Sequence, residues 1–132
     1  YEKFLENIPE SKLIFTTYND MILSAGIFIL DSKISIYYYG ASTSDKNYRN
    51  LMAPYLMQWF AIEKAKEIWS QYYDFLWVAS PWEINSPLAW VTDFKLKFTP
   101  EVRNVSESYI FIHQKFVYFL FQILKKIKSR FF

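Results

Sequence analysis

The side chains of this chain that can do chemistry are few, and they do not form a familiar catalytic set. Asp74 stands in a run of aromatic residues, where a buried carboxylate needs a partner. It is either a structural hydrogen-bond acceptor, which we favour, or a general base. Arg49 precedes a helical stretch and is equally suited to a phosphate group or to a surface salt bridge.

Three consecutive tyrosines, Tyr37, Tyr38 and Tyr39, must place at least one ring on each side of a strand. We expect a half-buried aromatic strand, with a hydroxyl lining a substrate cleft as the alternative. The chain has no cysteine, and His113 is its only histidine, at the end of an apolar run with no carboxylate cluster nearby. These counts favour a structural histidine and give no support to a metal site, a disulfide framework or a Ser-His-Asp arrangement.

The elements that must position these residues begin with three strands. The apolar runs at residues 12–18, 22–30 and 34–41 are separated by Asn19-Asp20 and by the turn residues 31–33, which predicts an antiparallel meander. An amphipathic helix follows, capped by Asn50 or begun a turn later at Pro54, and it ends near Trp69. Its predicted apolar face consists of Leu51, Tyr55, Leu56, Trp59, Ile62 and Ala65.

The second half of the chain continues with shorter elements. At 132 residues, 52% of them hydrophobic and 22% aromatic, the chain is long and apolar enough for one folded domain. After the long helix we expect a strand at 72–79, a loop at 81–87, a short helix at 88–98 with Thr92 or Asp93 near its start, strands at 101–105 and 108–113, and a helix at 116–130.

This order resembles the later part of an acetyltransferase-like (GNAT) domain. The resemblance implies an α/β (α+β) fold with a mixed, largely antiparallel sheet flanked by helices, without the first strand and helices; residues 1–8 would be the last turn of the second helix. Residues 1–132 would then be a single domain, the C-terminal part of a longer two-domain protein.

The turn at 42–50 contains no glycine and carries Asp45, which argues against a coenzyme A pyrophosphate cradle at the helix N-terminus.

A second resemblance is more specific, and its residues occur in order over about sixty positions. These residues resemble the FemABX family of peptidoglycan aminoacyltransferases, although Trp69, Trp77 and Lys97 stand where members of that family often carry glycine. The similar positions are Tyr39-Gly40-Ala41-Ser42, Tyr48-Arg49, Met52-Ala53-Pro54-Tyr55, Gln58-Trp59, Ala61-Ile62, Tyr73-Asp74-Phe75, Phe94-Lys95 and Phe98.

The resemblance implies a reaction in which an amino acid passes from aminoacyl-tRNA to the stem-peptide amine of a peptidoglycan precursor, with no metal or organic cofactor. Alternatives are an acyltransferase of cell-envelope polysaccharide synthesis that uses another donor, and a non-catalytic module of the same fold. Phe94 and Lys95 would be the catalytic residues. Tyr39, Tyr48, Arg49 and Asp74 would contribute to substrate binding.

The Phe-Lys pair has two interpretations. In the family, this motif lies near the tRNA acceptor end. Lys95 would therefore hold a phosphate or the charge that develops on the ester carbonyl, and Phe94 would pack beside it and stack on the terminal adenosine. Alternatively, Phe94 and Phe98 form the apolar i, i+4 face of a short helix and Lys95 is solvated.

Charge is unevenly placed along the chain. Residues 1–94 contain 7 Lys/Arg against 11 Asp/Glu, whereas residues 95–132 contain 8 Lys/Arg against 2 Asp/Glu. The basic end suits RNA phosphate or lipid headgroups, or simply complements a helix dipole. We expect a cytoplasmic protein, in which the last helix either packs on the rest of the protein or rests on the inner face of the membrane. The membrane contact would involve Lys125, Lys126, Lys128 and Arg130.

Overall fold

The computed structural model describes residues 1–79, 86–105 and 111–131, with side chains described as far as residue 127 in the last segment. The chain divides into two compact units, residues 1–100 and 101–132, and each is described by itself. The predicted loop at 81–87 and the predicted strand at 108–113 lie partly outside the described residues. The prediction of one domain over 1–132 stays a prediction.

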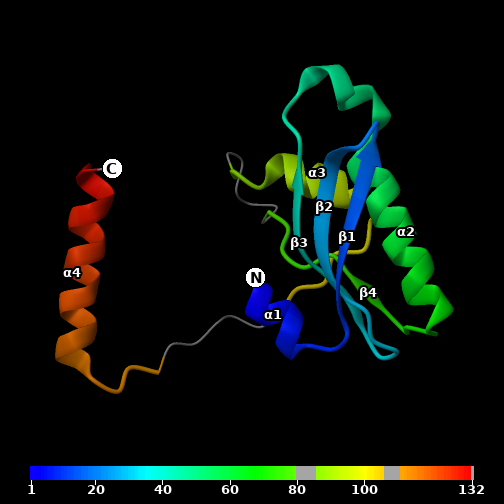
Figure 1. The fold of residues 1–132 in the computed structure, drawn as a ribbon. Helices are drawn as coiled ribbons and strands as arrows, with labels where there is room; N and C mark the ends of the chain where they lie inside the picture. Colours follow the sequence, from blue (N-terminus) through cyan, green and yellow to red (C-terminus); the bar gives the residue numbers. More distant parts are fainter. Residues whose placement is uncertain (80–85, 106–110, 132) are drawn as a thin grey trace. The chain divides into compact units, whose positions relative to one another are not determined.

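A mixed four-stranded sheet forms the frame of the first unit (Figure 1). Strands β1 (Ser11–Tyr18), β2 (Met21–Ile29) and β3 (Ser35–Ser42) run antiparallel, and the two-residue β4 (Tyr73–Asp74) pairs parallel with β3. Asn19 and Asp20 join β1 to β2 at φ values of 46° and 62°, as expected for a two-residue hairpin turn. The predicted meander and the predicted α+β class are confirmed.

β4 is much shorter than the predicted strand at 72–79. Leu76 adopts a left-handed φ of 57°, and its N–H donates to Oδ1 of Asp74 at 2.7 Å. This Asx turn bends the backbone out of the extended conformation two residues after Asp74. The hydrogen bond to Asp74 therefore ends β4, although the aromatic residues that follow have a high propensity for strands.

Within the described residues of the first unit, four helical segments accompany the sheet: α1 (Glu2–Asn7), the 3₁₀ helix η1 (Lys46–Leu51), α2 (Ala53–Glu67) and α3 (Ala89–Leu96). Helix α1 confirms the predicted helical turn near the N-terminus. The Asn50 cap is wrong, because Met52 stands before α2 in a left-handed conformation, with φ 51°, and Pro54 occupies the first turn. The short helix is confirmed at 89–96, but Thr92 lies in its interior rather than near its start.

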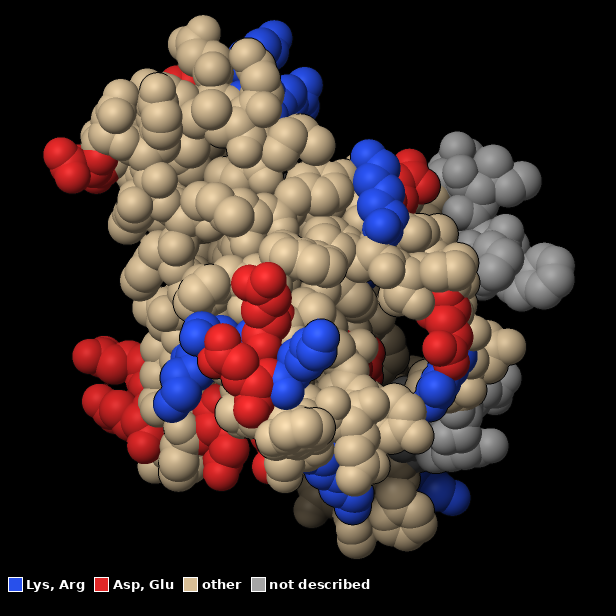
Figure 2. Space-filling view, turned by 90° about the vertical axis from the view of Figure 1, so that its right-hand side faces the viewer, with Lys and Arg blue, Asp and Glu red and all other residues tan. Residues whose placement is uncertain are grey.

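Helix α2 packs along one face of the sheet, against β1, β2 and β3 (Figure 1). The predicted apolar face is confirmed only in part: Ala65 is buried, Tyr55 and Ile62 are half-buried, and the other three residues are exposed. Leu56 and Trp59 are 61% and 57% exposed, and uncharged side chains cover the face of the molecule over the N-terminal part of α2, whereas charged ones gather over its C-terminal part (Figure 2). The residues of α2 that are buried against the sheet are Ala53, Met57, Gln58, Ala61 and Ala65.

The reason for this choice of face is the shape of the sheet. Gly26 and Gly40, the chain's only glycines, are cross-strand partners in β2 and β3. The rings of Phe28 and Tyr37 lie over them and stack with their centroids 5.3 Å apart. Because these rings already fill the space between sheet and helix, α2 presents its alanines there and turns its larger side chains outward.

The C-terminus of α2 shows why members of the family often carry glycine at the position of Trp69. Trp69 follows the helix at φ 60°, and the N–H groups of Trp69 and Ser70 bond to the carbonyls of Lys66 and Ala65, at 3.0 and 2.9 Å. This is a Schellman motif, in which the left-handed position usually carries glycine. Lys97, by contrast, has a right-handed φ of −73°, so its backbone does not require glycine.

Replacing Trp69 by glycine is expected to stabilise the chain by about 0.5–1 kcal/mol, because glycine avoids the left-handed strain and loses only an 87% exposed ring. Urea denaturation measures the change. The control is Trp69→Ala, which removes the same ring but keeps Cβ, and its expected effect is within about 0.5 kcal/mol of zero. Equal stabilisation by both variants would show that the ring, rather than the backbone, is the source of the effect.

The second unit contains helix α4 (Lys115–Phe131), which confirms the predicted final helix. The predicted strand at 101–105 is wrong, and residues 111–113 are not extended in a strand either. Val102 and Val105 are exposed, so the segment has no apolar face to bury, and Glu101 and Arg103 form a local ion pair at 2.7 Å. No helix in the described part of the chain is long and apolar enough to cross a membrane.

Candidate functional site

Lys95 is buried in the first unit, with 8% of its surface exposed, which excludes the solvated alternative. Its Nζ donates to the backbone carbonyl of Trp77 at 2.6 Å and lies 6.0 Å from the centroid of the Tyr37 ring. Burial lowers the pKa of Lys95 below its ordinary value, and the charge of Asp74 opposes part of that change. A cation has thus been placed in a poorly solvated position, where its charge acts more strongly than in water.

Thr92 makes a second bond to the same backbone segment, one turn before Lys95 on α3. Its Oγ1 accepts from the N–H of Ala79 at 2.7 Å and donates to the carbonyl of Leu88 at 2.9 Å. Thr92 and Lys95 therefore tie α3 to residues 77–79. This fixes the position of the ammonium relative to the end of β4.

Asp74 is half-buried at the end of β4. Its Oδ1 accepts from Leu76, as described above, which agrees with the structural role that the sequence favoured. Its charge is close enough to raise the pKa of Lys95, but the two residues do not form an ion pair. Asp74 therefore shapes the local field and the turn that leads to Trp77.

Phe94 belongs to a row of packed aromatic rings. Its ring contacts Tyr55 edge-on at 4.9 Å and Phe98 at 5.4 Å, and Phe98 stacks on Phe75. The i, i+4 packing of Phe94 and Phe98 is thus present, as the structural alternative proposed, while Lys95 beside them is buried. The row continues through Phe75 to Tyr37 and Tyr73, and so reaches the core.

A buried polar residue, Gln58, is bonded to Tyr73 at the core end of this row of rings. Gln58, fully buried on α2, accepts at Oε1 from the Tyr73 hydroxyl at 2.8 Å, and its Nε2 has no hydrogen-bond partner among the described residues. Burial raises the pKa values of the Tyr73 and Tyr37 hydroxyls above the ordinary tyrosine value. The bond from Tyr73 to Gln58 anchors the start of β4 on α2.

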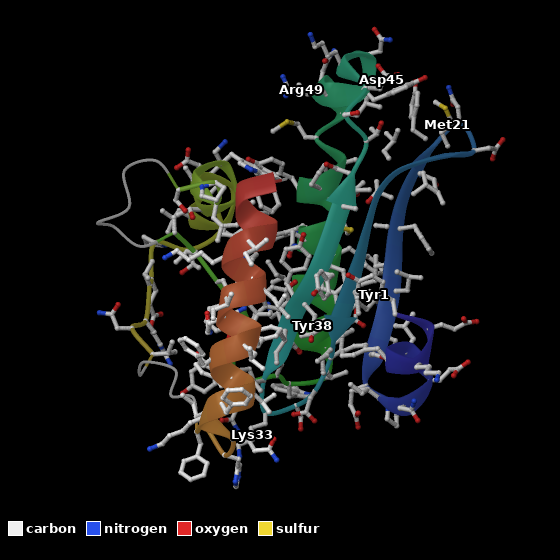
Figure 3. All side chains as sticks on the ribbon, turned by 90° about the vertical axis from the view of Figure 1, so that its left-hand side faces the viewer. Tyr1, Met21, Lys33, Tyr38, Asp45 and Arg49 are labelled. Atoms are coloured by element: carbon white, nitrogen blue, oxygen red, sulfur yellow. The ribbon has the colours of Figure 1, made fainter. Side chains whose placement is uncertain are left out.

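A pocket of about 430 Å³ lies where β3 ends, beside η1 and the first turn of α2. It brings together Tyr48 and Arg49, two of the predicted substrate-binding residues, with Asp45 and Trp90. Asp45 caps η1 by accepting from the N–H of Asn47 at 2.9 Å. Figure 3 shows Asp45 and Arg49 on the loop at the end of β3, well away from Tyr1 and Tyr38.

Tyr39 lies on the other face of the sheet. A bulge between Ile27 and Phe28 places Tyr38 and Tyr39 on the face away from α2, whereas Tyr37 points into the core. Tyr38 stacks on Phe4 at 4.7 Å, and Tyr39 contacts Tyr1 at 5.0 Å. The predicted division of the three rings between two faces is confirmed, and Tyr39 is separated from the pocket and from Lys95.

The sequence analysis gave no role in the site to Thr92, Gln58 or Trp90, although Gln58 is among the positions that are similar to the family. A threonine inside a predicted helix and a glutamine flanked by apolar residues were weak signals. Trp90 stands four residues before Phe94 and so shares its helix face, which is a signal that the sequence did contain. The described residues contain no group of His, Asp or Glu side chains that would hold a metal ion.

The fold is thus that of an α+β domain with a mixed sheet, as in acetyltransferase-like domains. The sequence model of the FemAB family matches residues 2–126, and the chain belongs to this family. The chain is 29% identical over 111 residues to aminoacyltransferase FemA of Staphylococcus epidermidis, covering 84% of the chain and 26% of that protein. It is 29% identical over 114 residues to aminoacyltransferase FemA of Staphylococcus aureus, covering 86% and 27%.

The chain therefore spans about a quarter of the length of the curated relatives it matches. No solved structure matches the chain. The family resemblance that the sequence indicated is confirmed, and the roles of the individual site residues stay predictions.

Proposed function

We propose that the chain is part of an aminoacyltransferase that moves an amino acid from aminoacyl-tRNA to the stem-peptide amine of a peptidoglycan precursor. Membership of the FemAB family supports the class, and the two relatives above are named as aminoacyltransferases. The observation that carries the proposal is Lys95, a buried cation fixed by α3 in the motif that the family resemblance singled out.

In the proposed reaction, the amine nitrogen of the precursor attacks the ester carbonyl of aminoacyl-tRNA. The new bond is an amide C–N bond, the ester C–O bond breaks, and the proton lost by the amine passes to the released ribose oxygen. Holding the two substrates together supplies part of the rate. The Lys95 ammonium stabilises the negative charge on the carbonyl oxygen in the transition state.

Two measurements test the proposal. Filter binding of aminoacyl-tRNA over a series of salt concentrations is expected to show affinity that falls linearly with salt on logarithmic axes. Mass spectrometry is expected to detect a precursor extended by one amino acid after incubation with aminoacyl-tRNA. Absence of tRNA binding together with transfer from another acyl donor would favour the envelope-polysaccharide alternative. Binding without transfer from any donor would favour a non-catalytic module.

Helix α4 supports a further part of the proposal, a contact with the inner face of an anionic membrane. Most of its described apolar side chains are exposed within its own unit, and Lys125 and Lys126 lie near the end of this apolar stretch. The side chains of Lys128 and Arg130 lie outside the described residues. Such a helix suits the surface of a bilayer that carries negative charge. The exposed apolar residues are Phe116, Val117, Phe119, Leu120, Phe121, Ile123, Leu124 and Ile127.

Deleting residues 125–132 is expected to weaken binding to vesicles that contain anionic lipid, because each basic residue near the surface contributes about 1 kcal/mol. Sedimentation with vesicles measures the change, and vesicles of neutral lipid serve as the control. Unchanged binding of the shortened chain to anionic vesicles would eliminate the membrane contact.

A further inference from the structure

The ring of Tyr37 is held on several sides in the first unit. It stacks on Phe28 with the two centroids 5.3 Å apart, and it contacts Phe75 edge-on at 6.5 Å. At its hydroxyl end the ring lies over Gly40, where an added Cβ would overlap the hydroxyl. A ring packed in this way has few alternative rotamers, so the fold fixes its position.

Gln58 adds a polar contact at the hydroxyl end of the ring. Burial raises the pKa of the Tyr37 hydroxyl, and the Gln58 side chain lowers it in part, which places the amide close to that hydroxyl. Gln58 is fully buried, and its Oε1 already accepts from the hydroxyl of Tyr73. One buried amide on α2 therefore supports two tyrosines, one on β3 and one on β4.

The ammonium of Lys95 lies over this fixed ring. The distance from Nζ to the Tyr37 centroid is 6.0 Å, which is the outer limit for a cation–π contact. An ammonium has three donors, and within the described part of the chain Nζ bonds to the carbonyl of Trp77.

Few other groups stabilise the charge of Lys95. The titratable groups beside it in the described residues are Tyr37 on β3 and Asp74 on β4, and Asp74 acts on Lys95 without forming an ion pair. The side chain is 8% exposed, so water contributes little. In such surroundings the negative face of a ring attracts a cation more strongly than it does at an exposed site.

We propose that Tyr37 is a positioning residue for Lys95, whose ring attracts the ammonium and keeps it charged beside the Trp77 carbonyl. The importance of this contact for catalysis rests on the proposed function, in which the charge of Lys95 stabilises the transition state. The contact itself does not depend on that reaction. Gly40 acts on the site through the same ring, because a larger residue there would displace it.

The experiment measures the pKa of Lys95 by NMR, from the Cε resonance of carbon-labelled lysine in the full 132-residue chain. Lys95→Met identifies the resonance by its loss. Tyr37→Phe keeps the ring face and is expected to leave the Lys95 pKa nearly unchanged. Trifluorophenylalanine in place of Tyr37 has almost the shape of phenylalanine, but its fluorines withdraw charge from the ring face. It is expected to lower the Lys95 pKa, so that the neutral fraction below the midpoint rises about two- to fivefold.

The matched control is trifluorophenylalanine in place of Phe98. Phe98 is a half-buried ring on the same segment as Lys95, and it belongs to the same row of rings but is not the ring over which Nζ lies. This chain is expected to keep the Lys95 pKa of the unaltered chain. An equal fall of the Lys95 pKa in both fluorinated chains would overturn the inference. So would a Lys95 pKa that does not fall when the ring at position 37 is fluorinated, or that falls as far in Tyr37→Phe.

Transfer by the same chains separates this inference from the proposed function. The chain fluorinated at position 37 is expected to lose transfer at a lower pH than Tyr37→Phe does, because Lys95 loses its proton earlier. If none of the chains transfers an amino acid but the Lys95 pKa falls as expected, the proposed function fails and the contact stands. If transfer occurs but the Lys95 pKa does not respond, the contact is wrong and the proposed function stands.

Discussion

Replacing Lys95 by alanine is expected to lower aminoacyl transfer about a hundredfold or more, the cost of removing one group that stabilises an oxyanion. The variant also loses the bond from Nζ to the Trp77 carbonyl, so we expect a loss of stability of about 1–3 kcal/mol. Initial rates under saturating substrates measure the first effect. Urea denaturation measures the second.

Thr92→Val provides the matched control for this variant. It removes the other side-chain bond between α3 and residues 77–79 and leaves the Ala79 N–H without its partner, at a similar cost in stability. Transfer is expected to change much less, because the Lys95 ammonium remains. If the two variants lose transfer equally, Lys95 only holds the segment in place, and its catalytic role is wrong.

The pH dependence of transfer gives a second test of Lys95. Burial lowers its pKa below 10.5, so the ammonium loses its proton at a lower pH than an ordinary lysine does. Transfer by the unaltered chain is therefore expected to decline on the alkaline side before pH 10.5. Lys95→Met, which has an apolar side chain of similar length, is expected to be slow and to lack this decline.

Local features of the sequence predicted the elements of the fold well. The apolar runs and the Asn19-Asp20 pair placed the three long strands within one or two residues, and helical spacing placed α3 and α4. These signals come from neighbouring residues, which is why a single sequence contains them. The Asx turn at Asp74 is also a local feature, but the high strand propensity of residues 72–79 led to the prediction of a longer strand there.

Features that depend on residues far apart in the chain were not predictable in the same way. The buried face of α2 is decided by the pairing of Gly26 with Gly40, a contact between two strands. The partner of Lys95 is a backbone carbonyl, which leaves no trace in the types of side chain. Trp90 and Phe94 share one face of α3, but only Phe94 packs on Tyr55 and Trp90 is exposed. Which of the two rings is packed depends on where Tyr55 lies in the fold.

Gly40→Ala is expected to have the largest effect on stability among single-methyl additions to the sheet. A Cβ at Gly40 would overlap the Tyr37 hydroxyl and lie 2.6 Å from Cζ of the same ring. The ring is confined between the sheet and α2, so we expect a cost of about 3 kcal/mol. Urea denaturation measures it. Ala41→Ser, which adds one atom to the next residue of β3, is the control and is expected to cost less than about 0.5 kcal/mol.

The double variant Gly40→Ala with Tyr37→Ala tests the cause. Removing the ring makes room for the added methyl group, so the double variant is expected to cost about 1–3 kcal/mol less than the sum of the single variants. Additive costs would show that the methyl group disturbs the backbone instead.

Because Lys95 Nζ lies 6.0 Å from the Tyr37 ring, a ring displaced by Gly40→Ala also alters the surroundings of the ammonium. Transfer by the folded fraction of Gly40→Ala is therefore expected to fall as well.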